Sequence, residues 1–373
     1  MIAMHYATIC AIAKNEESFI REWVEYHLLI GFEHIYIYDN NSRVPISEAL
    51  PEYIDSGLVT VINSSRDVDQ QRIAYMDCLQ KYGIQCKWMA FIDIDEFIVP
   101  KSGNDIRDIL DRYIDYGGLA IHWKMFGSGG HRTRPAGGVI KNYDKVVSFD
   151  NHIKSIVQPK KVDKVFTPHS FGYKDGSFCV NEDCIPVASY QSYHISRTIQ
   201  VNHYYYKSLE DFKDKIERGC ATGVDRDHAA AFADFARQES QEGILDQTIQ
   251  SLIEQKKSCM PTLEDICKNA SVGQKSLAEF ESLITDCISI NKIGLALNSV
   301  RICSRYYDAP IVWLLAARVH LLAEHHTECL YYLQKLLVDV DNPLRAGAYG
   351  CLADYYQFLQ NADAANSLQR AMS

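Results

Sequence analysis

Two carboxylates stand two residues apart at the end of an apolar run, Phe91-Ile92-Asp93-Ile94-Asp95-Glu96-Phe97. Side chains at positions i and i+2 of a strand point the same way, so Asp93 and Asp95 can converge while Ile94 faces the opposite side. Two carboxylates held together repel, and a divalent cation is the usual compensation. Hard oxygen ligands suit Mg²⁺ or Mn²⁺, and such an ion would hold a diphosphate. The alternative is that both residues only cap a surface turn.

His203 is a candidate for a third metal ligand, beside Tyr204-Tyr205-Tyr206. An imidazole added to carboxylates favours Mn²⁺ over Mg²⁺. Lys207 and Arg218 follow, and they could offer positive charge to phosphate oxygens. Each also has an ordinary explanation, namely a histidine hydrogen-bonded to backbone and cations on a solvated helix face.

The elements that must position these residues alternate between strand and helix. Apolar β-rich runs predict strands, and apolar residues at helical spacing predict helices. The predicted strands are 6–12, 33–38, 59–62 and 87–92, and the predicted helices include 19–28 and 67–82. This alternation predicts an α/β fold with a doubly wound, mostly parallel sheet, whose ligands bind at the carboxyl ends of the strands.

The pattern changes twice further along the chain. Residues 117–196 are short β-like runs broken by Gly, Pro and Asp, and residues 225–258 are predicted to be helical. From 263 onward the chain is amphipathic and helical, and a shift of 36 residues aligns Ala317 with Ala353 and Cys329 with Ala365. This resembles tetratricopeptide-type helical hairpins, although ordinary bundle packing is an alternative. We therefore predict a catalytic domain over 1–222, a helical connector over 223–262 and an all-α helical-hairpin domain over 263–373.

Composition narrows the class of protein. The chain has 373 residues, 47% of them hydrophobic and 23% charged, which is typical of a soluble globular protein. A net charge of −10 supplies no basic field for nucleic acid. The start has no secretory signal, no apolar stretch is long enough to span a bilayer, and twelve cysteines lie singly without a C-x-x-C pair. We expect a cytoplasmic protein, with at most peripheral contact at the inner membrane face.

Several short motifs together resemble glycosyltransferase family 92 and the related bacterial family 2 enzymes. The resemblance covers roughly residues 5 to 220. It rests on Lys14-Asn15-Glu16, Tyr38-Asp39-Asn40-Asn41-Ser42, the Asp93–Asp95 run, Trp123-Lys124-Met125-Phe126-Gly127-Ser128, Lys154-Ser155-Ile156-Val157-Gln158-Pro159, and Asn202-His203-Tyr204 with Lys207-Ser208.

The resemblance implies a GT-A fold, a nucleotide-sugar donor and metal-assisted sugar transfer, with Mn²⁺ (or Mg²⁺) as the cofactor. By the same resemblance, Lys14, Asn15 and Glu16 match the loop near the nucleoside, and Asp39 matches the acid that follows the second strand. Asp93 and Asp95 match the D-x-D metal site, and His203 matches a distal histidine that completes it. The acceptor implied by analogy is a glycan or a lipid-linked glycan in cell-surface glycan assembly.

Further candidates follow for the nucleotide, the sugar and the acceptor that the resemblance implies. Gln71 lies near the start of a predicted helix and could hydrogen-bond a nucleotide edge. Trp123 and Ser128, in a Gly-rich stretch, are predicted to form a wall for the acceptor or the donor sugar. A general base must come within about 3.2 Å of the acceptor hydroxyl or act through one water. The candidates for this base, among which no spacing decides, are Asp183, Glu182, Asp175 and His131.

Three other functions compete with this interpretation. A phosphatase also uses D-x-D, but Phe97 stands where that chemistry normally has Thr or Val. A metal-dependent nucleotidyltransferase would show a Gly-rich basic loop near the first strand, and Lys14-Asn15-Glu16-Glu17 is not one. The last alternative is a non-catalytic protein with a degenerate transferase domain, whose C-terminal helices bind a protein partner or a second copy of the chain.

Overall fold

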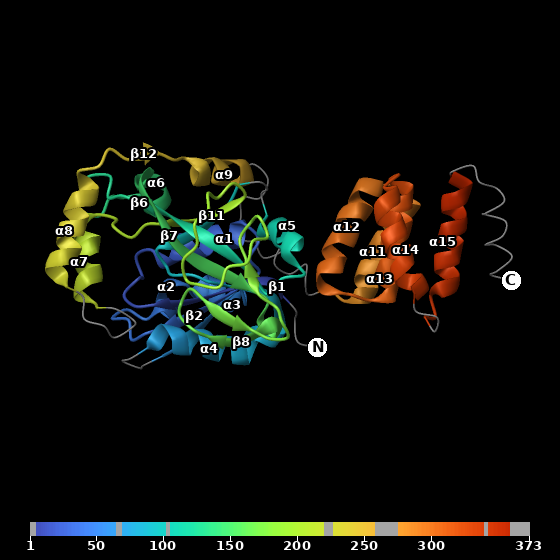
Figure 1. Cartoon of the computed structure of the whole chain (residues 1–373), viewed down its shortest axis with the longest axis horizontal. Helices are drawn as coiled ribbons and strands as arrows, with labels where there is room; N and C mark the ends of the chain where they lie inside the picture. Colours follow the sequence, from blue (N-terminus) through green and yellow to red (C-terminus); the bar gives the residue numbers. More distant parts are fainter. Residues whose placement is uncertain are drawn as a thin grey trace. The chain divides into compact units, whose positions relative to one another are not determined.

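The computed structural model describes residues 5–64, 69–101, 105–219, 227–257, 275–338 and 342–358. The chain divides into two compact units, Met1–Ser271 and Val272–Ser373. In the described residues the first unit contains strands and helices, and the second contains helices (Figure 1). The predicted boundaries after residues 222 and 262 fall in stretches outside the described residues, so they stay predictions.

The N-terminal half of the first unit alternates strand and helix, as predicted. Its elements are β1 (His5–Ala13), α1 (Ile20–Leu29), β2 (His34–Asp39), α2 (Ile46–Ala49), α3 (Pro51–Asp55), β3 (Val59–Asn63), α4 (Gln70–Tyr82), a 3₁₀ turn (Gly83–Gln85) and β4 (Cys86–Phe91). β1 pairs in parallel with both β2 and β4, and β2 pairs in parallel with β3. The four predicted strands and the parallel pairing are confirmed.

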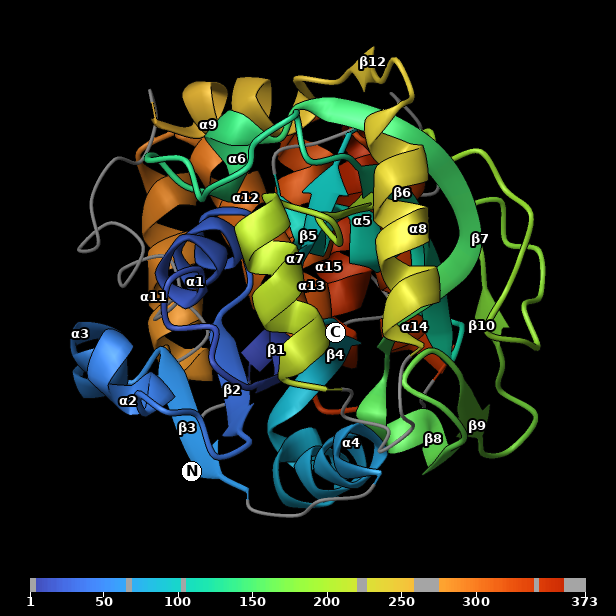
Figure 2. The ribbon, with the colours of Figure 1, turned by 90° about the vertical axis from the view of Figure 1, so that its left-hand side faces the viewer.

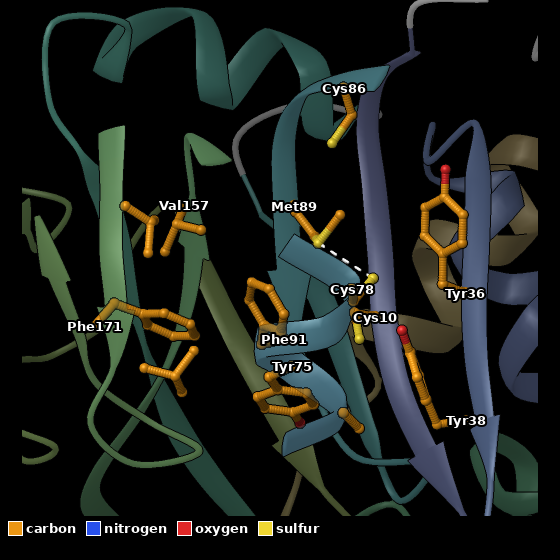
Figure 3. Close-up of a cluster of buried hydrophobic side chains, with 13 residues drawn as sticks. Cys10, Tyr36, Tyr38, Tyr75, Cys78, Cys86, Met89, Phe91, Val157 and Phe171 are labelled. Atoms are coloured by element: carbon orange, nitrogen blue, oxygen red, sulfur yellow. Dashed lines mark hydrogen bonds between the residues drawn. The ribbon is translucent and has the colours of Figure 1, made fainter. Parts of the chain in front are cut away.

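Strand β1 is buried on both faces. Cys10 packs with Tyr75 and Cys78 of α4 and with Phe91 of β4, in the cluster drawn in Figure 3. Its neighbours Ile9 and Ala11 point to the opposite face, because side chains alternate along a strand, and both are fully buried. A parallel strand covered on both faces reads as a continuous apolar run, which is why the sequence identified it.

The second half of the unit completes a mixed sheet. Its elements are β5 (Glu96–Pro100), α5 (Ile106–Leu110), a 3₁₀ turn (Asp111–Tyr113), β6 (Gly118–Phe126), α6 (Val139–Asn142), β7 (Lys145–Val157), a 3₁₀ turn (Pro159–Lys161), β8 (Val162–Val165), β9 (Phe171–Tyr173), β10 (Cys179–Val180), β11 (Ile199–His203) and α7 (Leu209–Glu217). The strand order is β3-β2-β1-β4-β7-β6-β11-β5. β10 pairs with β6, and β12 (Ile244–Leu245) pairs with β7, while β8 and β9 form a separate two-stranded sheet. β7 is antiparallel to β4 and β6, and β5 is antiparallel to β11. The predicted α/β class is confirmed, and the antiparallel strands are additions to it.

Strand β7 is long and curved (Figure 2), and its pairing with β6 is interrupted twice; the larger interruption lies near the middle of β7. Lys154 pairs with Ile121 and Ile153 with His122, but the next pair joins Phe149 to Lys124. Three residues of β7, Asp150–His152, therefore stand opposite one residue of β6, Trp123. Such a bulge bends a strand and re-aims its side chains.

The segment predicted as a helix over 225–258 is broken by a strand. It contains α8 (His228–Glu239), β12 (Ile244–Leu245) and α9 (Thr248–Lys257) in its described part. β12 pairs antiparallel with β7, and Phe235 of α8 packs with Phe212 of α7. Helix α8 ends at Glu239, and β12 follows Gly243, which approaches Lys145 so closely that a Cβ would lie 2.8 Å from the lysine side chain. These elements belong to the first unit.

Asp246 holds this segment in place. We expect its replacement to lower the free energy of unfolding more at neutral pH than at acidic pH. It is buried, pairs with Lys124 and accepts a hydrogen bond from the Thr248 amide at 2.9 Å. Burial opposes ionisation, but these contacts lower the pKa of Asp246 to about 2. A carboxyl with a lowered folded pKa stabilises the fold above its unfolded pKa of about 3.9, and this contribution is lost as pH falls towards 2.

Asp246→Asn should therefore cost about 2 kcal/mol at pH 7 and less at pH 3, as measured by urea unfolding. The matched control is Asp163→Asn on the exposed part of β8. Equal costs at both pH values would contradict this role for the carboxylate.

In its described part, the second unit consists of helical hairpins. Its helices are α11 (Leu277–Ser289), α12 (Ile293–Tyr306), α13 (Pro310–Leu322), α14 (His326–Val338) and α15 (Arg345–Phe358). α13 and α14 begin 33 residues after α11 and α12 respectively. Ala317 and Ala353, which the 36-residue shift aligned, are both buried, whereas Ala365 lies outside the described residues. The predicted helical region is confirmed.

Two further features concern membrane-spanning helices and the cysteines. No helix in the described parts of the chain combines the length and the apolar character needed to cross a membrane. Nine described cysteines are unbonded, and all except Cys184 are buried. They act there as small apolar side chains, as the sequence suggested.

Candidate active site

A cavity of about 460 Å³ opens at the carboxyl ends of β1, β4, β6 and β11. These strands run in the same direction, so their ends meet at one edge of the sheet. The predicted residues that line it are Lys14, Glu16, Gln71, Asp93, Asp95, Trp123, His203 and Arg218; Asn40, Pro168, His169, Tyr205 and Lys215 also line it. The structure thus brings both D-x-D carboxylates, the histidine and a basic group into one cavity.

Asp93 is held from two sides. Lys154 of β7 places its Nζ 3.0 Å from Asp93 Oδ2, and Gln71 of α4 donates to Oδ1 at 2.5 Å. The Lys154 side chain is only 1% exposed. Burial opposes ionisation of Asp93, but the Lys154 ammonium lowers the pKa of Asp93 below its usual value. Asp93 is therefore a carboxylate with a buried cationic partner.

Glu96 shapes the turn between the two aspartates. Its Oε2 accepts the Asp93 amide at 2.9 Å and lies 3.4 Å from Lys154 Nζ. The side chain is completely buried, and burial raises the pKa of Glu96 well above its ordinary value. Glu96 fixes the backbone that aims Asp93 and Asp95 into the cavity.

Asp95 is shared by a lysine and the predicted histidine. Lys215 Nζ lies 2.5 Å from Asp95 Oδ2, and His203 Nε2 faces the same oxygen at 3.5 Å. Burial opposes ionisation, yet Lys215 and His203 together bring the pKa of Asp95 well below its usual value. Burial lowers the pKa of His203, which favours the neutral imidazole.

The orientation of His203 suits a metal ligand. Its Nδ1 points at Glu96 Oε1 from 3.9 Å, and neither atom has a hydrogen-bond partner among the described residues. Metal-bound histidines commonly turn their second nitrogen toward a carboxylate in this way. The carboxylate oxygen of Asp95 and the imidazole nitrogen of His203 are therefore ligand atoms that suit Mn²⁺ or Mg²⁺. Lys154 and Gln71 engage both oxygens of Asp93, the third predicted ligand, and the described residues bring together no complete set of three such ligands. The role of Asp93 as a ligand therefore stays a prediction, and the nucleotide-sugar and water would have to complete the coordination.

A basic group borders the cavity on the side of the first loop. Arg218 Nη2 lies 2.5 Å from Glu16 Oε1, and its Nη1 donates to the Lys14 carbonyl at 3.0 Å. Lys207 does not line the cavity; its Nζ is 4.0 Å from Glu16 Oε2 and 3.9 Å from the centre of the Phe19 ring. Glu16 therefore organises the two cations predicted to meet phosphate.

Lys215 was not predicted from the sequence. It lies in α7, which Ser208 caps by accepting the Asp211 amide. Residues three apart share a helix face, so the pair Lys215 and Arg218 was the available signal. His169 was also missed because it lies in a loop without a pattern. Its Nδ1 is 2.8 Å from the Ile153 carbonyl, and burial together with Lys154 lowers the pKa of His169 to about 4.

Asn15 and Asp39 lie at the predicted strand ends but do not line the cavity. Asp39 accepts the Ser42 amide at 3.0 Å and the Ile46 amide at 2.9 Å, and Asn15 Oδ1 accepts the Arg43 amide at 2.9 Å. Both residues hold the loop after β2 in place. Their contacts are to the protein backbone beside the cavity.

The structure places Ser128, His131 and Asp183 away from this cavity. Ser128 lines a separate pocket of about 230 Å³ and donates to Glu239 Oε1 at 3.2 Å. His131 meets the Tyr143 ring edge-on at 5.7 Å. Asp183 forms an ion pair with Arg197 and lies 3.7 Å from His194 Nδ1. Their proposed roles remain predictions without a contact to the D-x-D cavity.

Comparison with known proteins agrees with the predicted resemblance. The family model of glycosyltransferase family 92 matches residues 5–240. A glycosyltransferase family 92 protein of Ricinus communis is 31% identical over 230 residues, which cover 59% of this chain and 39% of that protein. The galactan beta-1,4-galactosyltransferase GALS2 of Arabidopsis thaliana is 32% identical over 111 residues, covering 27% of this chain and 21% of that protein.

Among solved structures, TarS residues 1–349 of S. aureus in complex with UDP aligns with a TM-score of 0.33 and 12% identity, over 90% of this chain and 95% of that one. The chain spans less than two fifths of the length of the Ricinus relative. The family match extends over well more than half of the present chain and includes every strand that builds the cavity. The chain belongs to glycosyltransferase family 92.

Proposed function

We propose that the protein is a metal-dependent glycosyltransferase that moves a hexose from a nucleotide-sugar donor to a glycan or lipid-linked acceptor. The observation that supports this most is the convergence of Asp93, Asp95 and His203 with Arg218 in one cavity of a family 92 fold. The name of the Arabidopsis relative, a galactan galactosyltransferase, makes galactose the first donor sugar to test.

Each cavity residue has a proposed role. Asp95 and His203 would hold Mn²⁺ or Mg²⁺, and that ion, when bound, offsets the charge on the leaving diphosphate. Lys215 and Arg218 supply fixed positive charge beside it. Trp123 offers an aromatic face to a sugar ring, and Gln71 holds Asp93 in position through the hydrogen bond described above.

The wider setting follows from the same proposal. Transfer to a glycan or lipid-linked acceptor would serve cell-surface glycan assembly from the cytoplasmic side, with peripheral membrane contact. The tetratricopeptide-like hairpins of the second unit would bind a protein partner or a second copy of the chain.

A donor screen tests the activity. UDP- and GDP-sugars are incubated with Mn²⁺ and the full chain, and free nucleotide is measured, while calorimetry gives the affinities for Mn²⁺ and for UDP and GDP. Metal-dependent release of the nucleoside diphosphate supports the proposal. Binding without turnover would indicate a degenerate transferase domain, and release of pyrophosphate from a nucleoside triphosphate and a sugar phosphate would indicate a nucleotidyltransferase.

His203→Ala should raise the Mn²⁺ concentration needed for half-maximal donor hydrolysis by at least about tenfold, because changes around a metal ligand have effects of that size. Thermal stability should change little, since among the described residues the shortest ion-pair contact of the ring is the one to Asp95, at 3.5 Å. The control is His228→Ala on the exposed start of α8. An unchanged Mn²⁺ requirement would return His203 to an ordinary buried histidine.

A further inference from the structure

The bulge of β7 presents a carboxylate–histidine pair beside the cavity. His152 Nδ1 lies 2.6 Å from Asp150 Oδ1, and the same oxygen accepts the His152 amide at 2.8 Å. Burial opposes ionisation of Asp150, but these hydrogen bonds lower the pKa of Asp150, so it is a carboxylate at neutral pH. A carboxylate accepts only, so Nδ1 of His152 carries the proton and Nε2 carries the lone pair.

Both members of the pair are accessible. The His152 side chain is 29% exposed and that of Asp150 is 36% exposed. Gln191 places its amide nitrogen 3.5 Å from His152 Nε2, a distance that leaves this lone pair without a close hydrogen bond from that group. Nε2 of His152 can therefore receive a proton from a bound molecule.

Trp123 connects the pair to the donor side of the site. The His152 ring stacks on the Trp123 indole with centroids 5.0 Å apart, and the indole contacts the His203 ring at 4.4 Å. Trp123 lines the cavity together with Asp95 and His203. A sugar lying against Trp123 would have the proposed metal ligands on one side and His152 on the other.

The surface around the pair suits a sugar acceptor. Tyr190 has its ring 5.6 Å from that of His152 and is 45% exposed, and Phe149 directly before the bulge is 71% exposed. Exposed aromatic faces beside a few polar groups are typical of ligand sites that hold partly apolar rings. The acceptor class that this chemistry fits is a neutral glycan presenting a hydroxyl.

Resting on the proposed function, we infer that His152 is the general base of the transfer and that Asp150 is its positioning residue. His152 Nε2 removes the proton of the acceptor hydroxyl while that oxygen forms a bond to the anomeric carbon of the donor sugar. The bond from that carbon to the diphosphate oxygen breaks, and its electron pair leaves with the nucleoside diphosphate. Asp150 stabilises the resulting imidazolium, which then releases the proton to solvent. Direct displacement of this kind inverts the anomeric configuration.

The test measures full-chain variants with the donor identified by the screen and Mn²⁺, with water as the acceptor probe. His152→Ala should lower kcat for donor hydrolysis by about 10²- to 10⁴-fold. The dissociation constants for UDP or GDP and for Mn²⁺ should stay within about twofold of wild type, since the residue acts only on the acceptor side. Added imidazole should restore at least tenfold of the lost rate, and the released sugar should be inverted by NMR.

Two further variants keep the interpretation open to refutation if His152→Ala fails to fold. His152→Phe preserves the ring that stacks on Trp123, and Asp150→Asn preserves the size of the side chain but disturbs the tautomer of His152. Both variants should lower kcat with little change in KM, whereas the control His228→Ala should leave kcat unchanged. The assignment would be overturned if the released sugar retained its configuration or if His152→Phe kept the wild-type kcat. It would also be overturned if Asp183→Asn lost more activity than His152→Ala and imidazole failed to rescue His152→Ala. A wild-type chain that binds and hydrolyses no donor refutes the proposed function itself, and the assignment with it.

Discussion

Asp95→Asn is expected to reduce metal-dependent donor turnover by about 10²- to 10³-fold. In the proposed function the carboxylate contributes to an ion worth several kcal/mol of charge stabilisation, and each 1.4 kcal/mol is a factor of ten in rate. The amide keeps the shape of the side chain but loses its charge. The measurement is nucleotide release at saturating donor across a Mn²⁺ series, and turnover with wild-type metal dependence would show that Asp95 is not a ligand.

The same substitution should also destabilise the fold, because Lys215 loses its anionic partner in a buried position. Breaking one side of a buried ion pair commonly costs about 3 kcal/mol or more. Adding Lys215→Met removes the unpaired cation, so the double variant should recover much of the stability and none of the turnover. This separates the two roles of Asp95. A double variant as unstable as Asp95→Asn alone would contradict the proposed pairing energy.

Lys154→Met is expected to produce the largest loss of stability, about 3 to 5 kcal/mol at pH 7. The ammonium is buried and lies 3.0 Å from Asp93 and 3.4 Å from Glu96, so the change leaves two carboxyls without their cation. The matched control is Lys145→Met on the exposed start of the same strand. Urea unfolding of both variants is the measurement, and similar small losses would refute the role of Lys154.

The cost of Lys154→Met should shrink as the pH is lowered from 8 to 5. Lys154 lowers the pKa of Asp93 and opposes the rise that burial causes in the pKa of Glu96. Without it, both folded pKa values rise above the unfolded values of about 3.9 and 4.3, so the fold is favoured at low pH and loses stability as pH rises through the new values. A cost that grows on acidification would contradict this assignment of charge.

The sequence predicted the first half of the sheet well because its central parallel strands, β1 and β4, are almost entirely buried. Both are short, mostly apolar runs that end in turn-forming or polar residues, a combination that favours a strand over a helix. β7 could not be found in the same way. Asp150 and Asn151 stand in its middle, and residues of these types are depleted in regular strands. Only the tertiary pairing with β6 shows that the strand continues past its bulge.

The acidic part of the site was predictable, and the two lysines that pair with Asp93 and Asp95 were not. Carboxylates directly after an apolar strand are visible in a local window. The partners of Asp93 and Asp95 come from positions 61 and 120 residues further along the chain. Asp39 shows a different limit. The sequence correctly placed a carboxylate at the end of β2, but it could not show that nearby backbone amides engage both of its oxygens.

Asp150, Asn151 and His152 stand outside the regular pairing of β6 with β7, and this affects which changes of length the strand tolerates. A residue inserted or deleted within a regular ladder shifts the register and turns every later side chain to the other face. A bulge absorbs such a change locally, so the pairing of Ser155–Val157 with β4 and of Val146 with β12 would stay in place. If the proposed function and the role inferred for His152 hold, family members could vary their acceptors by lengthening or shortening this stretch while the D-x-D cavity keeps its geometry.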